Sequence, residues 1–166
     1  MTQLHQIREA VAQRADATLA AHRDWPCRKG CDECCRRLAA PPRISREEWL
    51  AVRSAIDALP AEIADAVRRR IREALGAAPP VVCPLLETAA GTCLVYEARP
   101  VACRAYGFYA ERDRVLGCGR IGAIAGTRPD VLWGNHAALE ERLGALGEAK
   151  EIHEWLAEDA ARAVPQ

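Results

Sequence analysis

The chain has 166 residues, of which 50% are apolar and 28% charged, a composition typical of one globular domain and unlike that of a disordered chain. Its 23 Lys and Arg residues balance 23 Asp and Glu residues, and aromatic residues make up only 5% of the chain. These values argue against nucleic acid as the main ligand, because binding a polyanion favours a basic excess and binding single strands favours stacking aromatics.

The first predicted element is an amphipathic helix over residues 4–22. Its apolar residues recur at three- and four-residue spacing and so share one helical face. They are Leu4, Ile7, Val11, Ala15 and Leu19. Charges throughout this segment exclude the apolar region of a secretory signal. The sequence contains no run of about 18 apolar residues, so no membrane span is predicted. The expected compartment is the cytoplasm.

Two more helices are predicted before residue 80. Ser45 and Glu48 have the spacing of a capping box, so a helix is expected to begin after Ser45 and to end near Pro60. Its inward residues are Trp49, Val52 and Ile56. A strict four-residue spacing predicts the next helix, which Gly76 stops. Its inward residues are Ile63, Val67, Ile71 and Leu75.

The middle of the chain, residues 81–124, is expected to be irregular because Gly, Pro and Cys interrupt its short apolar pieces. A small hairpin is predicted around residues 88–91. Gly117, Gly119 and Gly122 spell G-x-G-x-x-G, but a dinucleotide site needs a strand before this motif and a long helix after it. We therefore expect a glycine-rich loop there that approaches Cys118 or its metal.

Two helices are predicted to complete the chain, over residues 129–147 and 148–163. The expected fold is thus a mainly α, single domain over residues 1–166 with at most a short β-hairpin. Flanking helices within 1–22 and 128–164 are expected to surround a cysteine-cluster metal-binding region over 25–120.

Eight cysteines are the unusual part of the composition, and all are candidate metal ligands. About 5% cysteine is less than the roughly 8–10% of a disulfide-stapled miniprotein. In a reducing compartment, clustered cysteines bind metal or do redox chemistry more often than they form disulfides. Thiolates suit zinc, copper(I) and iron–sulfur clusters. The candidates are Cys27, Cys31, Cys34, Cys35, Cys83, Cys93, Cys103 and Cys118.

The pairing of these thiols stays open at the level of sequence. Two four-thiolate zinc sites, two cubane clusters or one larger polynuclear site would each use eight thiols. Because neighbouring side chains usually diverge, Cys34 and Cys35 are expected to serve different sites or different atoms of one cluster. Cys118 is the least secure ligand, since it stands alone in a glycine-rich stretch. His22 is an alternative ligand, although a lone helical histidine is more often a surface or core residue.

The order of the motifs resembles the CxxCxxCC cysteine-cluster family, the YkgJ type of zinc- or iron-chelating proteins. The first motif here is C-x3-C-x2-C-C, with three residues in the first gap where the family name has two. The others are Cys83-Pro-Leu-Leu, Gly91-Thr-Cys93-Leu-Val-Tyr-Glu and Arg99-Pro-x-x-Cys103-Arg-x-Tyr106. The resemblance implies a zinc or iron site, with a 4Fe-4S cluster among the options, and some relatives carry the same cluster in enzymes that methylate flagellin lysines.

Several residues are expected to surround the bound metal or cofactor. Arg99 and Arg104 flank Cys103 and are positioned in the sequence to offset the charge of thiolates, as are the basic residues beside the first four cysteines. Tyr106 is expected to lie in the same shell. Ordinary core packing is the competing explanation for the tyrosine, and a solvated basic surface is the competing explanation for the arginines.

Three functions fit a metal-binding, cysteine-rich domain of this kind. The first is a redox or electron-transfer protein with an iron–sulfur cluster and a protein redox partner. The second is a zinc-stabilised module that contacts another protein, and the third is a metal-handling protein without catalysis. The C-x3-C-x2-C spacing of radical S-adenosylmethionine enzymes is discounted, because those enzymes use a partial barrel and residues 1–80 are predicted to be helical. The sequence names no catalytic residue.

Overall fold

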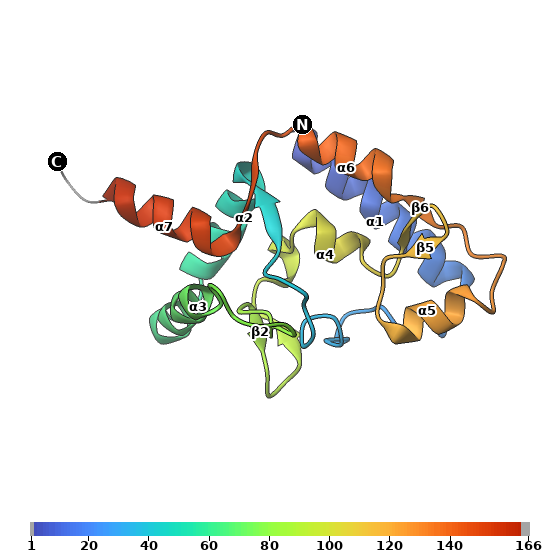
Figure 1. The fold of residues 1–166 in the computed structure, drawn as a ribbon, viewed down its shortest axis with the longest axis horizontal. Helices are drawn as coiled ribbons and strands as arrows, with labels where there is room; N and C mark the ends of the chain where they lie inside the picture. The colour runs from blue at the N-terminus through green and yellow to red at the C-terminus, as the bar shows by residue number, and fades with distance from the viewer. Residues whose placement is uncertain (1, 164–166) are drawn as a thin grey trace. The chain divides into compact units, whose positions relative to one another are not determined.

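Helices form most of the regular structure in a computed structural model that describes residues 2–163 (Figure 1). The expected mainly α fold is confirmed. The helices are α1 Gln3–Ala21, α2 Arg46–Asp57, α3 Ala61–Glu73, the 3-10 helix η1 Tyr96–Ala98, α4 Val101–Ala105, α5 Gly119–Ala125, α6 His136–Gly144 and α7 Ile152–Ala163. The strands are β1 Arg43–Ser45, β2 Leu86–Glu87, β3 Thr92–Cys93, β4 Tyr109–Glu111, β5 Arg114–Val115, β6 Gly134–Asn135 and β7 Ala149–Glu151. Over the described residues, no helix has the length and apolar character that crossing a membrane requires.

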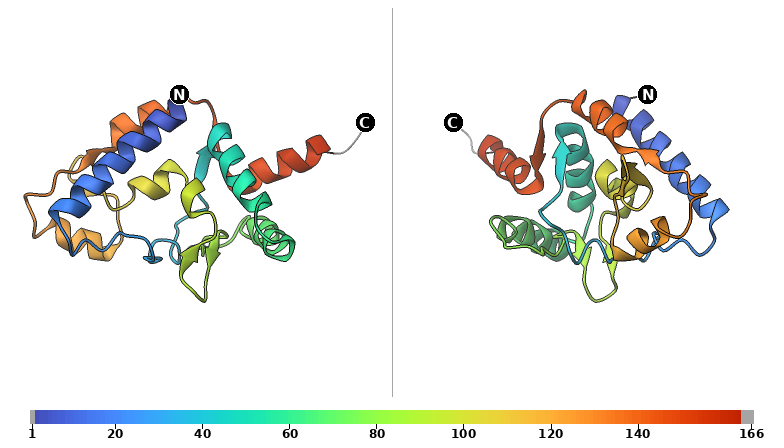
Figure 2. Two further views of the ribbon diagram at one scale, coloured as in Figure 1. Left: turned by 180° about the vertical axis from the view of Figure 1, so that it is seen from behind. Right: turned by 45° about the vertical axis from the view of Figure 1, so that its right-hand side comes forward.

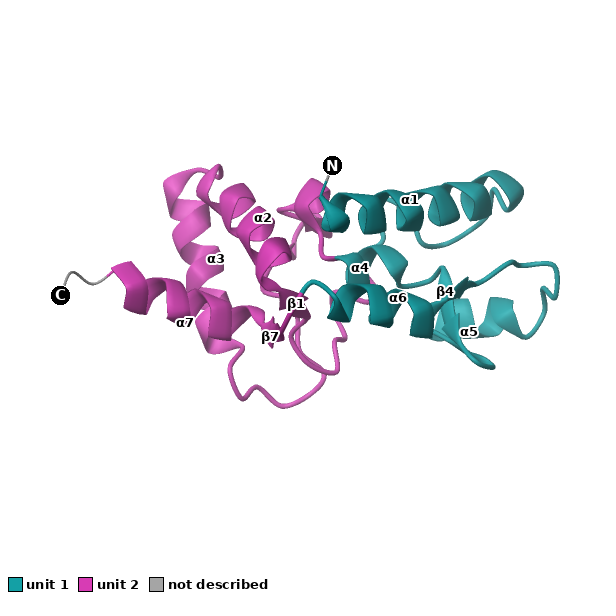
Figure 3. Cartoon of the chain, turned by 90° about the horizontal axis from the view of Figure 1, so that it is seen from above, with its two compact units in different colours: residues 1–31, 101–146 teal, residues 32–100, 147–166 magenta. Residues whose placement is uncertain are grey.

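The chain divides into two compact units, each assembled from two separate stretches of sequence (Figure 3). Unit 1 comprises residues 1–31 and 101–146, and unit 2 comprises residues 32–100 and 147–166. The expected single domain over residues 1–166, with a metal-binding region over 25–120, stays a prediction.

Unit 1 is built on α1, which contacts both α4 and α6. Figure 2 shows α1 and α6 lying side by side. The predicted first helix is confirmed to within one residue at each end, and the Thr2 side chain caps it by accepting a hydrogen bond from the His5 backbone. A small sheet of order β5-β4-β6 completes the unit. The buried core residues are Leu4, Ile7, Val11, Trp25, Val101, Ala105, Phe108, Tyr109, Ile121, Val131 and Leu139.

Two predictions for unit 1 are wrong. The helix expected from residue 129 begins at His136, because the Asn135 side chain accepts a hydrogen bond from the Ala138 backbone at 3.1 Å and caps the helix there. Residues 134–135 instead form β6, which pairs in parallel with β4. The glycine-rich stretch after Cys118 is a seven-residue helix, α5, and not a loop.

Gly134 supports a close approach between β6 and the aromatic ring of Tyr109. A Cβ atom at position 134 would lie 2.5 Å from the ring, where no side chain fits without displacing it. We expect Gly134→Ala to lower the free energy of unfolding of the protein by about 1–3 kcal/mol, the usual cost of overpacking a core. Urea denaturation followed by tryptophan fluorescence measures this change.

Gly144→Ala is the matched control for Gly134→Ala. Gly144 is the last residue of α6, and a Cβ there meets nothing within 4 Å. Since alanine favours helix over glycine, this control should be neutral or slightly stabilising. Equal effects of the two substitutions would contradict the proposed steric role of Gly134.

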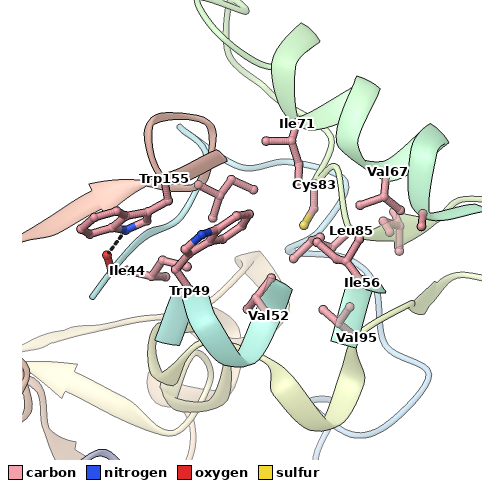
Figure 4. Close-up of a cluster of buried hydrophobic side chains, with 13 residues drawn as sticks. Ile44, Trp49, Val52, Ile56, Val67, Ile71, Cys83, Leu85, Val95 and Trp155 are labelled. Carbon is pink, nitrogen blue, oxygen red and sulfur yellow. Dashed lines mark hydrogen bonds between the residues drawn. The ribbon is translucent and has the colours of Figure 1, made fainter. Parts of the chain in front are cut away.

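Unit 2 packs α2, α3 and α7 against one another beside the β1–β7 pair. The capping box is confirmed. The Glu48 backbone N–H donates to the Ser45 hydroxyl, and the Ser45 backbone N–H donates to the Glu48 carboxylate. Figure 4 shows the apolar core between the helices, where Trp155 donates from its indole to the Ile44 carbonyl at 2.8 Å. Its buried residues are Ile44, Trp49, Val52, Ile56, Ala64, Val67, Ile71, Cys83, Leu85, Leu86, Val95, Ile152 and Trp155.

The inward face of α3 differs from the predicted one at both ends. Ile63 is 40% exposed and Leu75 is 64% exposed and lies beyond the end of the helix. The buried face consists of Ala64, Val67 and Ile71. A strict four-residue spacing advances about 40° beyond a full turn at each step, so its outer members rotate off the face that its central members share.

Candidate metal centre

The eight cysteines fall into two sets of four, one set in each unit. All eight are free thiols, and Cys83 is the most buried of them, with 8% of its surface exposed. The set in unit 1 is Cys27, Cys31, Cys103 and Cys118. The set in unit 2 is Cys34, Cys35, Cys83 and Cys93. The stretch that supplies the first four cysteines thus divides between Cys31 and Asp32, and each unit receives two of them.

The turn at residues 32–37 brings the sulfurs of Cys34 and Cys35 within 4.0 Å of each other. The Arg36 backbone donates to the Asp32 carbonyl and the Arg37 backbone donates to the Cys34 carbonyl, so the chain coils here. Consecutive side chains point to opposite sides only in extended chain. The coiled backbone therefore removes the divergence that was expected for these two neighbours.

Cys83 joins this pair through backbone pairing of two distant segments. Its backbone N–H donates to the Cys35 carbonyl at 2.7 Å. The neighbouring Leu38 and Val81 exchange both backbone hydrogen bonds, which makes a short antiparallel bridge. The Cys83 thiol lies close enough to the Cys35 thiol to raise its pKa. Cys83 lies inside the apolar core of unit 2, and Cys35 packs against that core.

Cys93 is the fourth member and lies on the predicted hairpin. Strands β2 and β3 pair antiparallel, with Cys93 opposite Leu86, so the hairpin is confirmed in a short form. Cys93 packs against the same core as Cys35. Its thiol also lies within electrostatic range of Cys34 and Cys35.

Burial and mutual hydrogen bonding raise the pKa values of the unit 2 thiols. The hydrogen bond with Cys35, together with burial, raises the pKa of Cys34 far above its ordinary value. For Cys35, the hydrogen bond with Cys34 lowers the pKa, but the nearby Cys83 thiol and burial outweigh it and raise the pKa to about 12. Burial also raises the pKa of Cys93, against the charge of Arg99. Cation binding here therefore has to displace thiol protons.

The tip of the hairpin is tied to the cysteine turn by Asp32 and Arg36. Arg36 donates from Nε to the Asp32 carboxylate at 2.6 Å and from its terminal nitrogen to the Thr88 carbonyl at 2.8 Å. The Asp32 carboxylate lies directly against Gly91, where a Cβ atom would approach it to 2.8 Å. Sequence reasoning missed Asp32, although its four-residue spacing from Arg36 is a recognisable ion-pair signal.

We expect Gly91→Ala to loosen this tie. Gly91 has φ +65°, so alanine meets backbone strain there, and its Cβ displaces the Asp32 carboxylate. The expected loss is about 1–2 kcal/mol of unfolding free energy from the strain, with a further loss from the broken Asp32 contact. Urea denaturation measures both.

Gly76→Ala isolates the strain from the contact. Gly76 also belongs to unit 2 and has φ +69°, but a Cβ there meets nothing within 4 Å. Gly91→Ala should therefore cost more than Gly76→Ala. If the two variants unfold at the same urea concentration, the contact with Asp32 contributes nothing to stability.

The predicted cofactor shell is divided between the units. Arg99 belongs to unit 2, where it donates to the Tyr96 carbonyl and its guanidinium lies 3.7 Å from the centre of the Tyr96 ring. Arg104 and Tyr106 belong to unit 1, within or just after α4. The alternative ligand His22 is the C-cap residue of α1, and its ring centre lies 5.7 Å from that of Trp25. The charge of Arg99 acts on Cys93, a thiol of unit 2.

The donor set of unit 2 has the chemistry of a zinc or iron site. Its four soft sulfur donors include Cys83 inside the apolar core and Cys35 and Cys93 packed against it, and Cys34 lies beside Cys35. Within residues 2–163, no three Cys, His, Asp or Glu side chains already stand in a chelating arrangement. The thiol groups therefore have to rotate about their side-chain bonds to close on an ion.

Comparison with known proteins identifies one family. Residues 26–117 match the family model CxxCxxCC, described as a putative zinc- or iron-chelating domain. This stretch contains every cysteine except Cys118. No curated protein and no solved structure matches the chain.

Proposed function

Because the chain belongs to the CxxCxxCC family of zinc- or iron-chelating domains, we propose that unit 2 is a zinc-stabilised module with one ion held by four thiolates. The proposed ligands are Cys34, Cys35, Cys83 and Cys93. They come from three segments, so one ion would join the turn at 32–37, the residues beside the Leu38–Val81 bridge, and the β2–β3 hairpin.

The observation that carries this proposal is the separation of the two adjacent sulfurs. Two thiolates on one tetrahedral zinc, each about 2.3 Å from the ion, lie about 3.8 Å apart. The sulfurs of Cys34 and Cys35 are 4.0 Å apart. A cubane cluster attaches each thiolate to a different iron atom and so spreads its ligands more widely. The short separation therefore favours a mononuclear site.

Zinc would supply cross-linking and no electron transfer, since it has a single stable oxidation state. The module then uses the ion to hold its irregular segments together, and its remaining surface is available for contact with another protein. The charge of Arg99 beside Cys93 would offset part of the net charge of −2 that four thiolates leave on one zinc ion.

A redox protein with iron–sulfur clusters is the second candidate. The observation that favours it is the equal division of the thiols, because four cysteines in each unit is the number that a 4Fe-4S cluster requires. This function would need a protein redox partner, and a metal-handling role would need reversible loading of the same thiols.

One measurement separates these candidates. The protein is purified without oxygen and without chelating tags, and its zinc, iron and acid-labile sulfide are quantified beside its visible spectrum. The zinc module predicts a colourless protein with bound zinc and no sulfide. A brown protein with sulfide equal to its iron would replace the zinc module by the electron-transfer candidate. A protein without bound metal, even after addition of Zn²⁺, would contradict both.

A further inference from the structure

We infer that unit 1 holds a second and separate zinc ion, bound by the thiolates of its own four cysteines. This inference rests on the proposed function of unit 2 and extends it to residues that the unit 2 site does not use. The proposed ligands are Cys27, Cys31, Cys103 and Cys118.

Gly107 lies where three chain segments of unit 1 that carry cysteines come together. The sulfur of Cys27 lies against the α-carbon of Gly107, in the space that a side chain would fill. Cys103 lies one helical turn earlier in α4. The Gly107 backbone, at φ +90°, donates to the Leu116 carbonyl at 2.6 Å, two residues before Cys118. The chain segments that carry Cys27, Cys103 and Cys118 therefore converge on one glycine.

The start of α5 packs at the same place. Cys118 is the N-cap residue of α5, and Ile121 from the first turn of this helix lies 3.7 Å from the position of a Gly107 Cβ atom. Cys27 and Cys118 both pack against the buried apolar cluster of unit 1. Two of the proposed ligands thus border the same apolar cluster, whose low polarity strengthens the attraction between thiolates and a cation.

A tight turn supplies the fourth ligand. The Cys31 backbone donates to the Arg28 carbonyl at 3.0 Å, which bends the chain between Cys27 and Cys31. The Arg28 side chain donates to the carbonyls of Trp25 and Arg23 and so holds this bend onto the end of α1. A bend of this kind lets two cysteines four residues apart face one ion, as they do in zinc sites with short Cys–Cys spacings.

The test counts zinc ions and maps their ligands separately. The protein is loaded with Zn²⁺ under reducing conditions, desalted and assayed for zinc per chain. Each cysteine is then followed by its rate of alkylation with iodoacetamide, read by peptide mass spectrometry. We expect two zinc ions per chain, with all eight thiols protected relative to the protein stripped by a chelator.

Substitutions in each unit should remove one ion and leave the other. Cys103→Ser and Cys118→Ser should each lower the zinc content from two ions to one and keep the unit 2 thiols protected. Cys35→Ser should do the reverse. Ala102→Ser, an exposed neighbour of Cys103 in α4, is the control that keeps both ions. The alkylation pattern of the unsubstituted protein remains informative if a substituted chain does not fold.

Three results would overturn the second site. One zinc ion per chain with rapidly alkylated unit 1 thiols would leave the unit 2 proposal standing alone. Loss of all zinc from every single variant would indicate one shared polynuclear site. No zinc and no protection in either unit would remove the proposed function together with this inference.

Discussion

If unit 2 holds zinc as proposed, Cys83→Ser is expected to abolish that binding and to destabilise the unit more than any other single thiol replacement in its set. Cys83 is the most buried of the eight cysteines and lies inside the apolar core. The substitution removes a proposed ligand and also buries a hydroxyl. The second effect alone costs about 1–3 kcal/mol. Loss of a structural zinc adds to it, since metal affinity at such a site is folding free energy.

Two companion variants separate ligation from packing in this experiment. Cys83→Ala keeps a small apolar side chain but offers no ligand, so it should lose zinc as completely as Cys83→Ser. Val81→Ala truncates a buried residue two positions away on the same segment and should cost stability while keeping the zinc. Zinc content after desalting and urea denaturation with and without a chelator are the readouts. Retention of the unit 2 zinc by Cys83→Ala would show that Cys83 is a core residue and not a ligand.

Trp49→Ala should produce the largest loss of stability that does not involve a thiol. Trp49 is fully buried in the apolar core of unit 2 (Figure 4). Its indole donates to the Asp159 carboxylate at 2.7 Å and so links α2 to α7. Truncating a buried tryptophan costs about 3–5 kcal/mol. That is a large share of the roughly 5–15 kcal/mol by which domains are stable.

The expected loss of stability comes from more than the cavity that Trp49→Ala leaves, because the substitution also removes a hydrogen bond to the Asp159 carboxylate. It also accepts from Arg46 at 2.7 Å and from Arg53 at 2.9 Å. Burial raises the pKa of Asp159, but the hydrogen bonds from Trp49 and the two arginines outweigh burial and keep that pKa below its usual value. Trp49→Ala therefore leaves a charged network without one of its donors.

Trp49→Phe and Leu50→Ala complete the second experiment. The phenylalanine variant keeps most of the buried apolar surface and loses the indole donor, so it should cost less than alanine. Leu50 is the next residue and is 41% exposed, so its truncation should be close to neutral. Urea denaturation of the zinc-loaded protein ranks the three. A Trp49→Ala variant as stable as Leu50→Ala would contradict the packing described for unit 2.

Local signals in the sequence predicted the elements that depend on local contacts. The capping box at Ser45 and the apolar spacing of the first helix involve residues within one or two helical turns, and both are confirmed. The start of α6 was misplaced because Pro129 and Asp130 also resemble a helix start. Asn135 caps α6 instead, and it also belongs to β6, which pairs in parallel with β4. No local pattern in the sequence reveals this long-range pairing.

Which thiols lie in the same unit could not be predicted from the sequence, because it depends on long-range pairing within the fold. Cys35 meets Cys83 through the pairing of Leu38 with Val81, which are far apart in the chain. Spacing alone showed eight thiols and the option of two sets of four, but not which thiols share a unit. The close sulfurs of Cys34 and Cys35 depend on the coiled backbone at 32–37, and the sequence rule for neighbouring side chains assumed extended chain.

The interleaved course of the chain through its two units bears on the order in which the ribosome releases the ligands. A nascent chain that has emerged to residue 100 carries all four thiols of unit 2 but only Cys27 and Cys31 of unit 1. Unit 2 then still lacks α7, which the ribosome releases last among the described helices. With the proposed unit 2 ligands, a growing chain is therefore expected to capture its metal in unit 2 before α7 adds Ile152 and Trp155 to the core that contains Cys83.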